Sequence, residues 1–179
     1  MGLNVYELTL MVPLMVISYL FGRFSHLIPV TFFQRSLKNT EKASGAKTGK
    51  YSCTYYKNNR LEHTKLILCA RNDLKMGKGK LAAQCCHATL GVVKKIETEK
   101  DELLLQIWRN YGQPKIVTKV DSLSQLKEIR QNAGKANVPT YTVCDAGKTQ
   151  IPSGSYTVLA VGPAPDSVLD GITSHLKLM

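Results

Sequence analysis

The chain has 179 residues, of which 44% are apolar and 21% charged, and its length allows one compact domain plus a tail. This apolar content excludes a wholly disordered chain, and an odd count of 5 cysteines without metal-ligand spacing argues against a disulfide scaffold or a metal site. The formal net charge of +11 favours a polyanionic partner, either nucleic acid or an anionic membrane, with a merely soluble basic protein as the alternative.

An uncharged apolar run occupies residues 8–21, and basic residues follow it from Arg23 onward. The run is short for a bilayer span, which needs about 20 apolar residues, unless flanking side chains snorkel. The basic flank predicts that the chain after it remains in the cytosol. We therefore expect a hydrophobic membrane anchor within residues 1–34. The alternatives are a buried amphipathic helix and a disordered leader.

Residues 35–63 are polar and basic and show no apolar periodicity, which predicts a flexible linker. A chain of this length spans about 25–30 Å on average, enough to hold a domain clear of a membrane. Tyr51, Tyr55 and Tyr56 lie among its lysines and could stack on nucleic-acid bases. We favour a solvated linker for this segment.

From residue 64 onward, strand-like and helical patterns alternate. Apolar runs typical of strands lie at residues 65–70, 115–120, 140–144 and 156–161. Helical patterns lie at residues 80–96, 101–111, 122–136 and 165–174. Helical crossovers favour parallel pairing of the first three strands, whereas a short connection lets the fourth run antiparallel. The prediction for residues 64–179 is an α/β domain with a small mixed sheet of about four strands and helices on both faces.

The first candidate site follows the first strand, at residues 76–80 (MGKGK). Gly77 and Gly79 allow backbone N–H groups to line an anion site at a helix start, where lysines add positive charge. On the helix that follows, Lys80, Gln84 and His87 fall at i, i+4 and i+7, on one face. The pattern taken alone favours a solvated polar stripe.

The second candidate site follows the third strand, at residues 145–155 (DAGKTQIPSGS). Ligand chemistry in such sheets gathers at the carboxyl ends of strands, which is where both loops lie. If the two loops meet, Asp145 lies near Lys80 and His87, where a carboxylate can orient a water and an ammonium can stabilise an oxyanion. The alternatives are an Asx turn at Asp145 and a structural role for His87.

Five ordered blocks of this region resemble the archaeal/eukaryotic-type peptidyl-tRNA hydrolase family. They are residues 71–88, 112–120, 145–155, 158–165 and 175–178. The resemblance implies a four-stranded mixed sheet, often a homodimer, and hydrolysis of the ester that joins a peptide to the 3′ ribose of tRNA. An apolar N-terminal segment ahead of the domain is similar in layout to the animal, mitochondrion-associated members.

The resemblance also assigns site residues one at a time. Lys80 and Asp145 correspond to the family's essential lysine and acid, and Thr149 to a threonine of the catalytic site. Gln84, His87 and Thr157 match residues that line the same cleft. We expect hydrolysis without metal or cofactor. Acceptor-stem phosphates would be neutralised by Lys75, Lys78, Lys115 and Lys148.

Two other functions remain open at this point: a membrane-tethered interaction scaffold and an RNA-binding domain without turnover. We expect the mitochondrial outer membrane as the location, with the domain facing the cytosol. The alternatives are the cytosol and the surface of the endoplasmic reticulum. The sequence indicates no particular protein partner.

Overall fold

The computed structural model describes residues 48–56, 62–147 and 151–179. The chain divides into two units, Met1–Gly45 and Ala46–Met179, and every described residue belongs to the second. The predicted anchor within residues 1–34 therefore lies outside the described residues. Within the described ranges, no helix combines the length and apolarity that crossing a membrane requires.

A four-stranded sheet forms the centre of this unit, and its strand order is β2-β1-β4-β3. The strands are β1 (Thr64–Arg71), β2 (Lys115–Val120), β3 (Thr140–Cys144) and β4 (Tyr156–Pro165). The helices are α3 (Ser52–Tyr55), α4 (Lys78–Thr98), α5 (Glu102–Asn110), α6 (Leu123–Lys135) and α7 (Asp166–Thr173). All the strands and helices predicted for residues 64–179 are present, with ends displaced by a few residues. Among the described elements, α3 alone was not predicted.

The strand pairing agrees with the prediction for β2 and differs for β3. β1 and β2 pair in parallel, with Leu66 opposite Lys115, as the helical crossover between them requires. β3, however, pairs only with β4, in an antiparallel hairpin. The connection between these two strands is too short for a crossover, and β4 also pairs antiparallel with β1. As a result β4 separates β1 from β3, and the prediction that β3 pairs with the first two strands is wrong.

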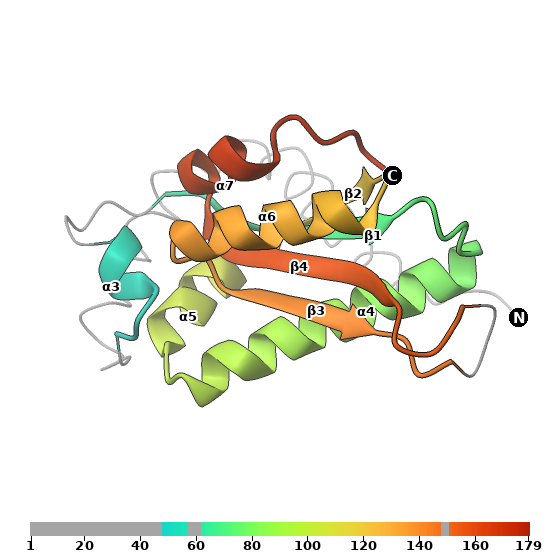
Figure 1. Ribbon diagram of the computed structural model, residues 1–179. Helices are drawn as coiled ribbons and strands as arrows, with labels where there is room; N and C mark the ends of the chain where they lie inside the picture. The colour runs from blue at the N-terminus through green and yellow to red at the C-terminus, as the bar shows by residue number, and fades with distance from the viewer. Residues whose placement is uncertain (1–47, 57–61, 148–150) are drawn as a thin grey trace, which may run out of the picture. The chain divides into compact units, whose positions relative to one another are not determined.

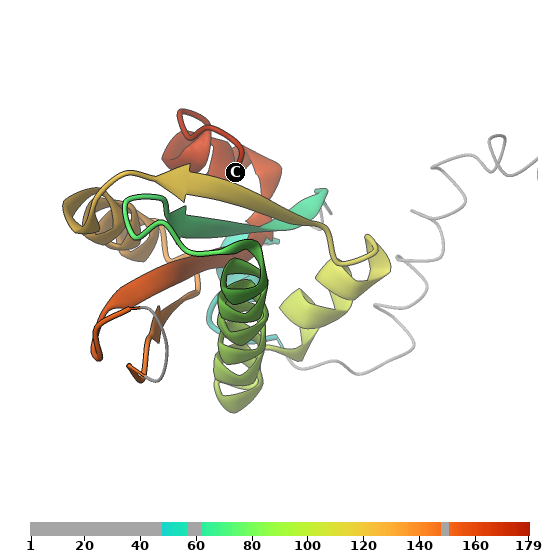
Figure 2. The ribbon, with the colours of Figure 1, turned by 90° about the vertical axis from the view of Figure 1, so that its right-hand side faces the viewer.

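Helices cover both faces of the sheet, as predicted: α4 and α5 lie on one side, α6 and α7 on the other (Figures 1 and 2). The alternation along β1 explains this. Leu66, Leu68 and Ala70 are buried against α4 and α5, whereas Ile67 and Cys69 point into the core beneath α6 and α7. A strand that is buried on both faces reads as a continuous apolar run, which is why the sequence of β1 has no polar alternation.

Residues 48–56 do not form the solvated linker that their composition predicts. The Asp101 carboxylate, completely buried, accepts hydrogen bonds from the backbone N–H groups of Tyr51 (2.7 Å), Ser52 (2.9 Å) and Leu104 (3.3 Å). Tyr51 and Tyr56 are only 3% and 7% exposed and belong to the apolar core. One carboxylate therefore caps α5 and at the same time fixes the segment that contains α3.

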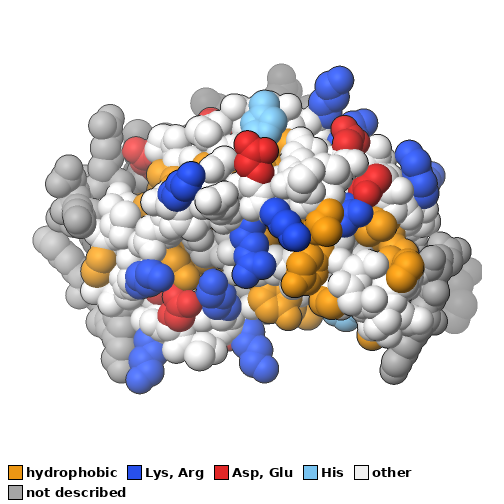
Figure 3. Space-filling view, in the orientation of Figure 1, with side chains coloured by type: hydrophobic (Ala, Val, Ile, Leu, Met, Phe, Trp, Pro, Cys, Tyr) orange, Lys and Arg blue, Asp and Glu red, His pale blue; other side chains and the backbone are white. Residues whose placement is uncertain are grey.

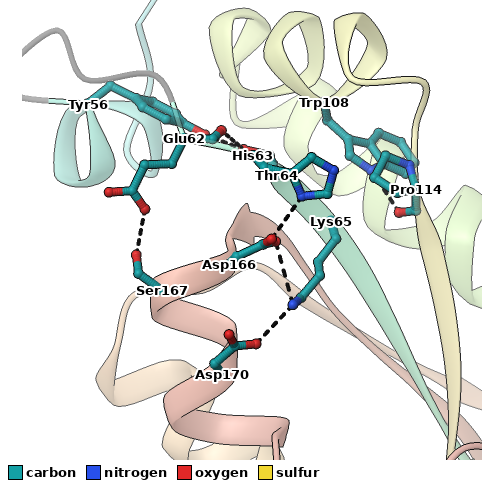
Figure 4. Close-up of polar contacts among 10 residues, drawn as sticks. All are labelled: Tyr56, Glu62, His63, Thr64, Lys65, Trp108, Pro114, Asp166, Ser167 and Asp170. Atoms are coloured by element: carbon teal, nitrogen blue, oxygen red, sulfur yellow. Dashed lines mark hydrogen bonds and ion pairs between the residues drawn. The ribbon is translucent and has the colours of Figure 1, made fainter. Parts of the chain in front are cut away.

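A polar cluster joins the start of β1 to α7 (Figure 4). His63 Nδ1 lies 2.9 Å from Asp166 Oδ2, and Lys65 Nζ lies 2.9 Å from Asp170 Oδ1. The Ser167 hydroxyl donates to the Glu62 carboxylate at 2.6 Å in the same region. These contacts lie at the amino end of β1, away from the candidate loops, and they fix α7 against the sheet.

Candidate functional site

The two predicted loops meet at one edge of the sheet. β1 and β3 both run antiparallel to β4, so their carboxyl ends point the same way. Lys80 lies in the first turn of α4, which follows β1, and Asp145 comes directly after β3. Lys80 Nζ is 2.8 Å from Asp145 Oδ2, and the two side chains are only 12% and 6% exposed. The topology thus produces a largely buried ion pair from two distant segments.

Among the described residues, three donors hold Asp145. Its Oδ2 accepts from Lys80 and from Gln84 Nε2 at 3.2 Å, and its Oδ1 accepts from the Gly147 backbone N–H at 2.8 Å. The Lys80 ammonium, and next the Gly147 N–H, hold the pKa of Asp145 below its ordinary value. An ionised carboxylate offers about four acceptor positions, one more than the donors among the described residues occupy, so it can also accept from a water or a substrate hydroxyl.

Thr157 orients the amide of Gln84 from the buried side. Thr157 is fully buried, and its hydroxyl donates to Gln84 Oε1 at 2.5 Å, with the Val143 carbonyl oxygen farther away at 3.4 Å. Because the amide oxygen is fixed by this donor, the amide NH₂ group must face Asp145. Thr157 therefore acts on the carboxylate through Gln84 rather than by direct contact.

A groove of about 840 Å³ opens beside the ion pair. One wall is a single face of α4, and the other is β3 with the residues that follow it. The lining residues are Lys80, Ala83, Gln84, His87, Leu90, Gly91, Lys94, Tyr141, Thr142, Val143, Cys144, Asp145 and Ala146. Among the described residues, no three His, Cys, Asp or Glu side chains are grouped so that they could hold a metal ion.

The remaining predicted residues are distributed unevenly. Lys75 and Lys78 are exposed where the loop after β1 enters α4, close in sequence to Lys80. Lys115 lies at the opposite, amino end of the sheet, where its ammonium donates to the Gln113 carbonyl and lies over the Trp108 ring. The structure therefore does not bring Lys115 to the groove. Lys148 and Thr149 lie outside the described residues.

Basic side chains are spread over much of the face seen in Figure 3, with acidic side chains between them. The first turn of α4 contains no acidic residue, and its N-cap, Gly77, provides no side-chain cap. The N–H groups at this helix start and the lysines beside them form a local site where an anion is favoured.

Sequence reasoning missed the far half of the groove, which contains Leu90, Gly91 and Tyr141. A Cβ at position 91 would overlap the Tyr141 ring, so glycine there lets the ring lie against α4. The signal was present in the helix face already recognised: continued from Lys80 beyond His87, the same face reaches Gly91 and Lys94. Nothing in the sequence alone showed that β3 would lie along that face.

The part of the chain that contains the sheet is similar to known proteins. Residues 64–179 match the family model described as peptidyl-tRNA hydrolase PTH2. The "Probable peptidyl-tRNA hydrolase 2" of Dictyostelium discoideum is 50% identical over 114 residues, which cover 64% of this chain and 54% of the relative. The human "Peptidyl-tRNA hydrolase 2, mitochondrial" is 46% identical over 114 residues, covering 64% and 63%.

An archaeal relative matches over almost its whole length. The "Peptidyl-tRNA hydrolase" of Methanothermobacter thermautotrophicus is 44% identical over 115 residues, which cover 64% of this chain and 99% of that protein. By contrast, the matched part of the chain spans between half and two thirds of the Dictyostelium and human relatives. The similarity is thus concentrated in the part of the chain that contains the sheet and the groove.

Proposed function

Because the chain belongs to the peptidyl-tRNA hydrolase PTH2 family, we propose that it hydrolyses the ester between a peptide and the 3′ ribose of tRNA. The observation that carries this proposal is the Lys80–Asp145 pair, 2.8 Å apart beside an open groove. Ester hydrolysis needs a positioned water and a group that stabilises negative charge as it develops. This pair offers one group for each task.

In the proposed mechanism, Asp145 orients the attacking water through its remaining acceptor position, with Thr149 as a further contact. A carboxylate with a lowered pKa is a weak base, so its main contribution is orientation rather than complete proton removal. The Lys80 ammonium stabilises the developing oxyanion or the leaving ribose oxygen. Gln84, fixed by Thr157, keeps the carboxylate in place, and His87 lines the cleft.

The tRNA is proposed to lie with its acceptor-stem phosphates near Lys75, Lys78 and Lys148. Support comes from the exposed positions of Lys75 and Lys78 at the uncapped start of α4. Phosphate contacts of this kind fix position without reading sequence, which suits an enzyme that accepts many tRNAs.

The test is release of labelled peptide from peptidyl-tRNA by the full chain. Release with multiple turnovers supports the proposal. Binding of peptidyl-tRNA without release would instead favour an RNA-binding module, and neither binding nor release would favour an interaction scaffold. Sedimentation velocity of the same sample tests the homodimer that the family resemblance implies.

For location, the proposal is the mitochondrial outer membrane, with residues 8–21 as the anchor and the hydrolase domain in the cytosol. It is supported by the apolar run and its basic flank, and by relatives from Homo sapiens and Bos taurus whose names include "mitochondrial". Imaging a fusion of residues 1–60 to a fluorescent protein tests it. Diffuse cytosolic signal, or signal on the endoplasmic reticulum, would contradict it.

A further inference from the structure

The outer edge of β3 carries backbone groups that have no partner among the described residues. β3 is an edge strand, and its inner partner is β4. The Gly162 N–H donates to the Pro139 carbonyl, and the Asp145 N–H donates to the Ser155 carbonyl, both at 2.9 Å. Because backbone groups alternate in direction along a strand, residues 139, 141, 143 and 145 face β4. The N–H and C=O groups of Thr142 and Cys144 therefore point outward.

At the start of β3, a hydrogen bond confirms that the backbone groups of Thr140 point outward. Lys95 Nζ, from α4, donates to the outward carbonyl of Thr140 at 3.2 Å. Across the described ranges, no backbone group pairs with the outward N–H and C=O groups of Thr142 and Cys144. Lys95 thus bounds one end of a short free edge, and the Lys80–Asp145 pair bounds the other.

This free edge forms a wall of the groove. Consecutive strand side chains point to opposite faces of a sheet, yet residues 141–146 all line the same groove. Such an unbroken run means that the edge of the strand, with its backbone, faces the cavity. The groove therefore presents hydrogen-bonding groups of the main chain along its length, and they lead directly to Asp145.

We propose that the peptide part of peptidyl-tRNA binds this edge as a fifth strand, parallel to β3. The inference rests on the proposed function, since it assigns the substrate of the same site. The scissile ester lies at the peptide's carboxyl end, and the Lys80–Asp145 pair lies at the carboxyl end of β3. The peptide must therefore run back from the ester toward Thr140, in the same direction as β3.

Backbone pairing suits a substrate whose side chains vary. In a parallel pair, a residue whose N–H and C=O both point at the partner strand bonds the two residues that flank its opposite number. Thr142 and Cys144 would thus engage alternate peptide amides. At about 3.3 Å per residue, the free edge accommodates about four or five peptide residues. Leu90 and Tyr141, 68% and 41% exposed, provide apolar contacts for whichever side chains face α4.

The first test uses the wild-type chain and N-acetylated peptidyl-tRNAs with peptides of one, two, three, five and eight residues. We expect kcat/KM to rise about tenfold up to four or five residues and then to level off. N-methylation of the amides that face β3 should abolish the gain, whereas N-methylation of the intervening amides should not. Hydrolysis at one rate for every length would overturn the peptide strand but leave the proposed function standing. Failure to hydrolyse any of them would overturn the proposed function itself.

The second test is Thr142→Pro, with Thr142→Val as the matched control. Proline removes only an outward N–H and breaks no bond to β4, which is where edge strands tolerate proline. We expect the ratio of kcat/KM between five-residue and one-residue substrates to fall below about threefold in Thr142→Pro and to keep its wild-type value in Thr142→Val. An unchanged ratio in Thr142→Pro would overturn the proposal. Weaker binding of deacylated tRNA by Thr142→Pro would also overturn it, because the groove would then hold RNA. If Thr142→Pro does not fold, the N-methylated substrates of the first test decide whether the peptide pairs with β3.

Discussion

Gln84 lies between Thr157 and Asp145, accepting a hydrogen bond from one and donating to the other. The three residues come from α4, from β4 and from the loop after β3, so the chain of contacts crosses three elements. Its consequence is that a fully buried hydroxyl, which does not line the groove, helps to hold the Asp145 carboxylate through Gln84. The site is therefore supported from the core of the sheet and not only by its surface loops.

Replacing Thr157 by valine should weaken hydrolysis without removing a group that touches substrate. The change leaves Gln84 Oε1 without its donor, which costs about 1–3 kcal/mol for a buried polar group and frees the amide to turn away. We expect kcat to fall about tenfold with KM little changed. Thr157→Ser keeps the hydroxyl and should restore most of the rate. Loss in Thr157→Ser without loss in Thr157→Val would show that the methyl packing matters, and not the hydrogen bond.

The Lys80 ammonium should keep Asp145 ionised to unusually low pH. Because the folded-state pKa is lowered, the pair stabilises the fold above the ordinary aspartate pKa of about 3.9, and this contribution is lost as pH falls through the folded value. A ¹³C NMR titration of the carboxyl should give a midpoint below the ordinary value in the wild type and a higher one in Lys80→Ala. Identical midpoints would contradict the assignment of the shift to Lys80.

Asp101→Ala should destabilise the domain although it lies outside the groove. The substitution leaves three backbone N–H groups, those of Tyr51, Ser52 and Leu104, without their acceptor. We expect the free energy of unfolding to fall by about 2–4 kcal/mol, measured by urea denaturation. The neighbouring Glu102 is exposed, so Glu102→Ala should change it by about 0.5 kcal/mol at most. Similar values for the two variants would contradict the capping role of Asp101.

Truncation provides an independent test of the segment around α3. A chain that starts at residue 62 loses the buried rings of Tyr51 and Tyr56, whereas a chain that starts at residue 46 keeps them. We expect the shorter chain to unfold about 5–10 °C lower in a thermal scan. Coincident transitions would show that residues 48–56 are dispensable and would restore the linker prediction.

Binding of tRNA should depend steeply on salt because phosphate contacts release counterions. Lys75→Ala and Lys78→Ala should each reduce the slope of log Kd against log salt by about one. Lys127→Ala, an exposed lysine on α6 across the sheet, is the matched control and should leave the slope unchanged. A slope that does not change in Lys75→Ala or Lys78→Ala would remove the proposed phosphate contacts at the start of α4.

Much of the fold could be predicted because local patterns determine it. The apolar runs gave all four strands, and the face shared by Lys80, Gln84 and His87 is the face that lines the groove. The site hypothesis depended on the two loops meeting, and Lys80 and Asp145 do meet, because the carboxyl ends of strands that run in one direction share an edge.

The rest depended on contacts between distant segments. β4 lies between β1 and β3 because it pairs with β1 along one edge and with β3 along the other. No local sequence pattern shows which strands pair in this way. Tyr51 and Tyr56 lie in a polar, basic stretch, and only the distant Asp101 and the core beneath α5 turn that stretch into part of the domain. Composition therefore gave the wrong interpretation there.

Lys80 and Asp145 are proposed to act together on the ester. Single-turnover release of peptide from peptidyl-tRNA tests this for the full chain and for Lys80→Ala, Asp145→Ala and the double variant. Each single variant should lose at least about 100-fold in rate while keeping its thermal stability, and the double variant should lose little more. Near-wild-type release by either single variant would contradict the claim.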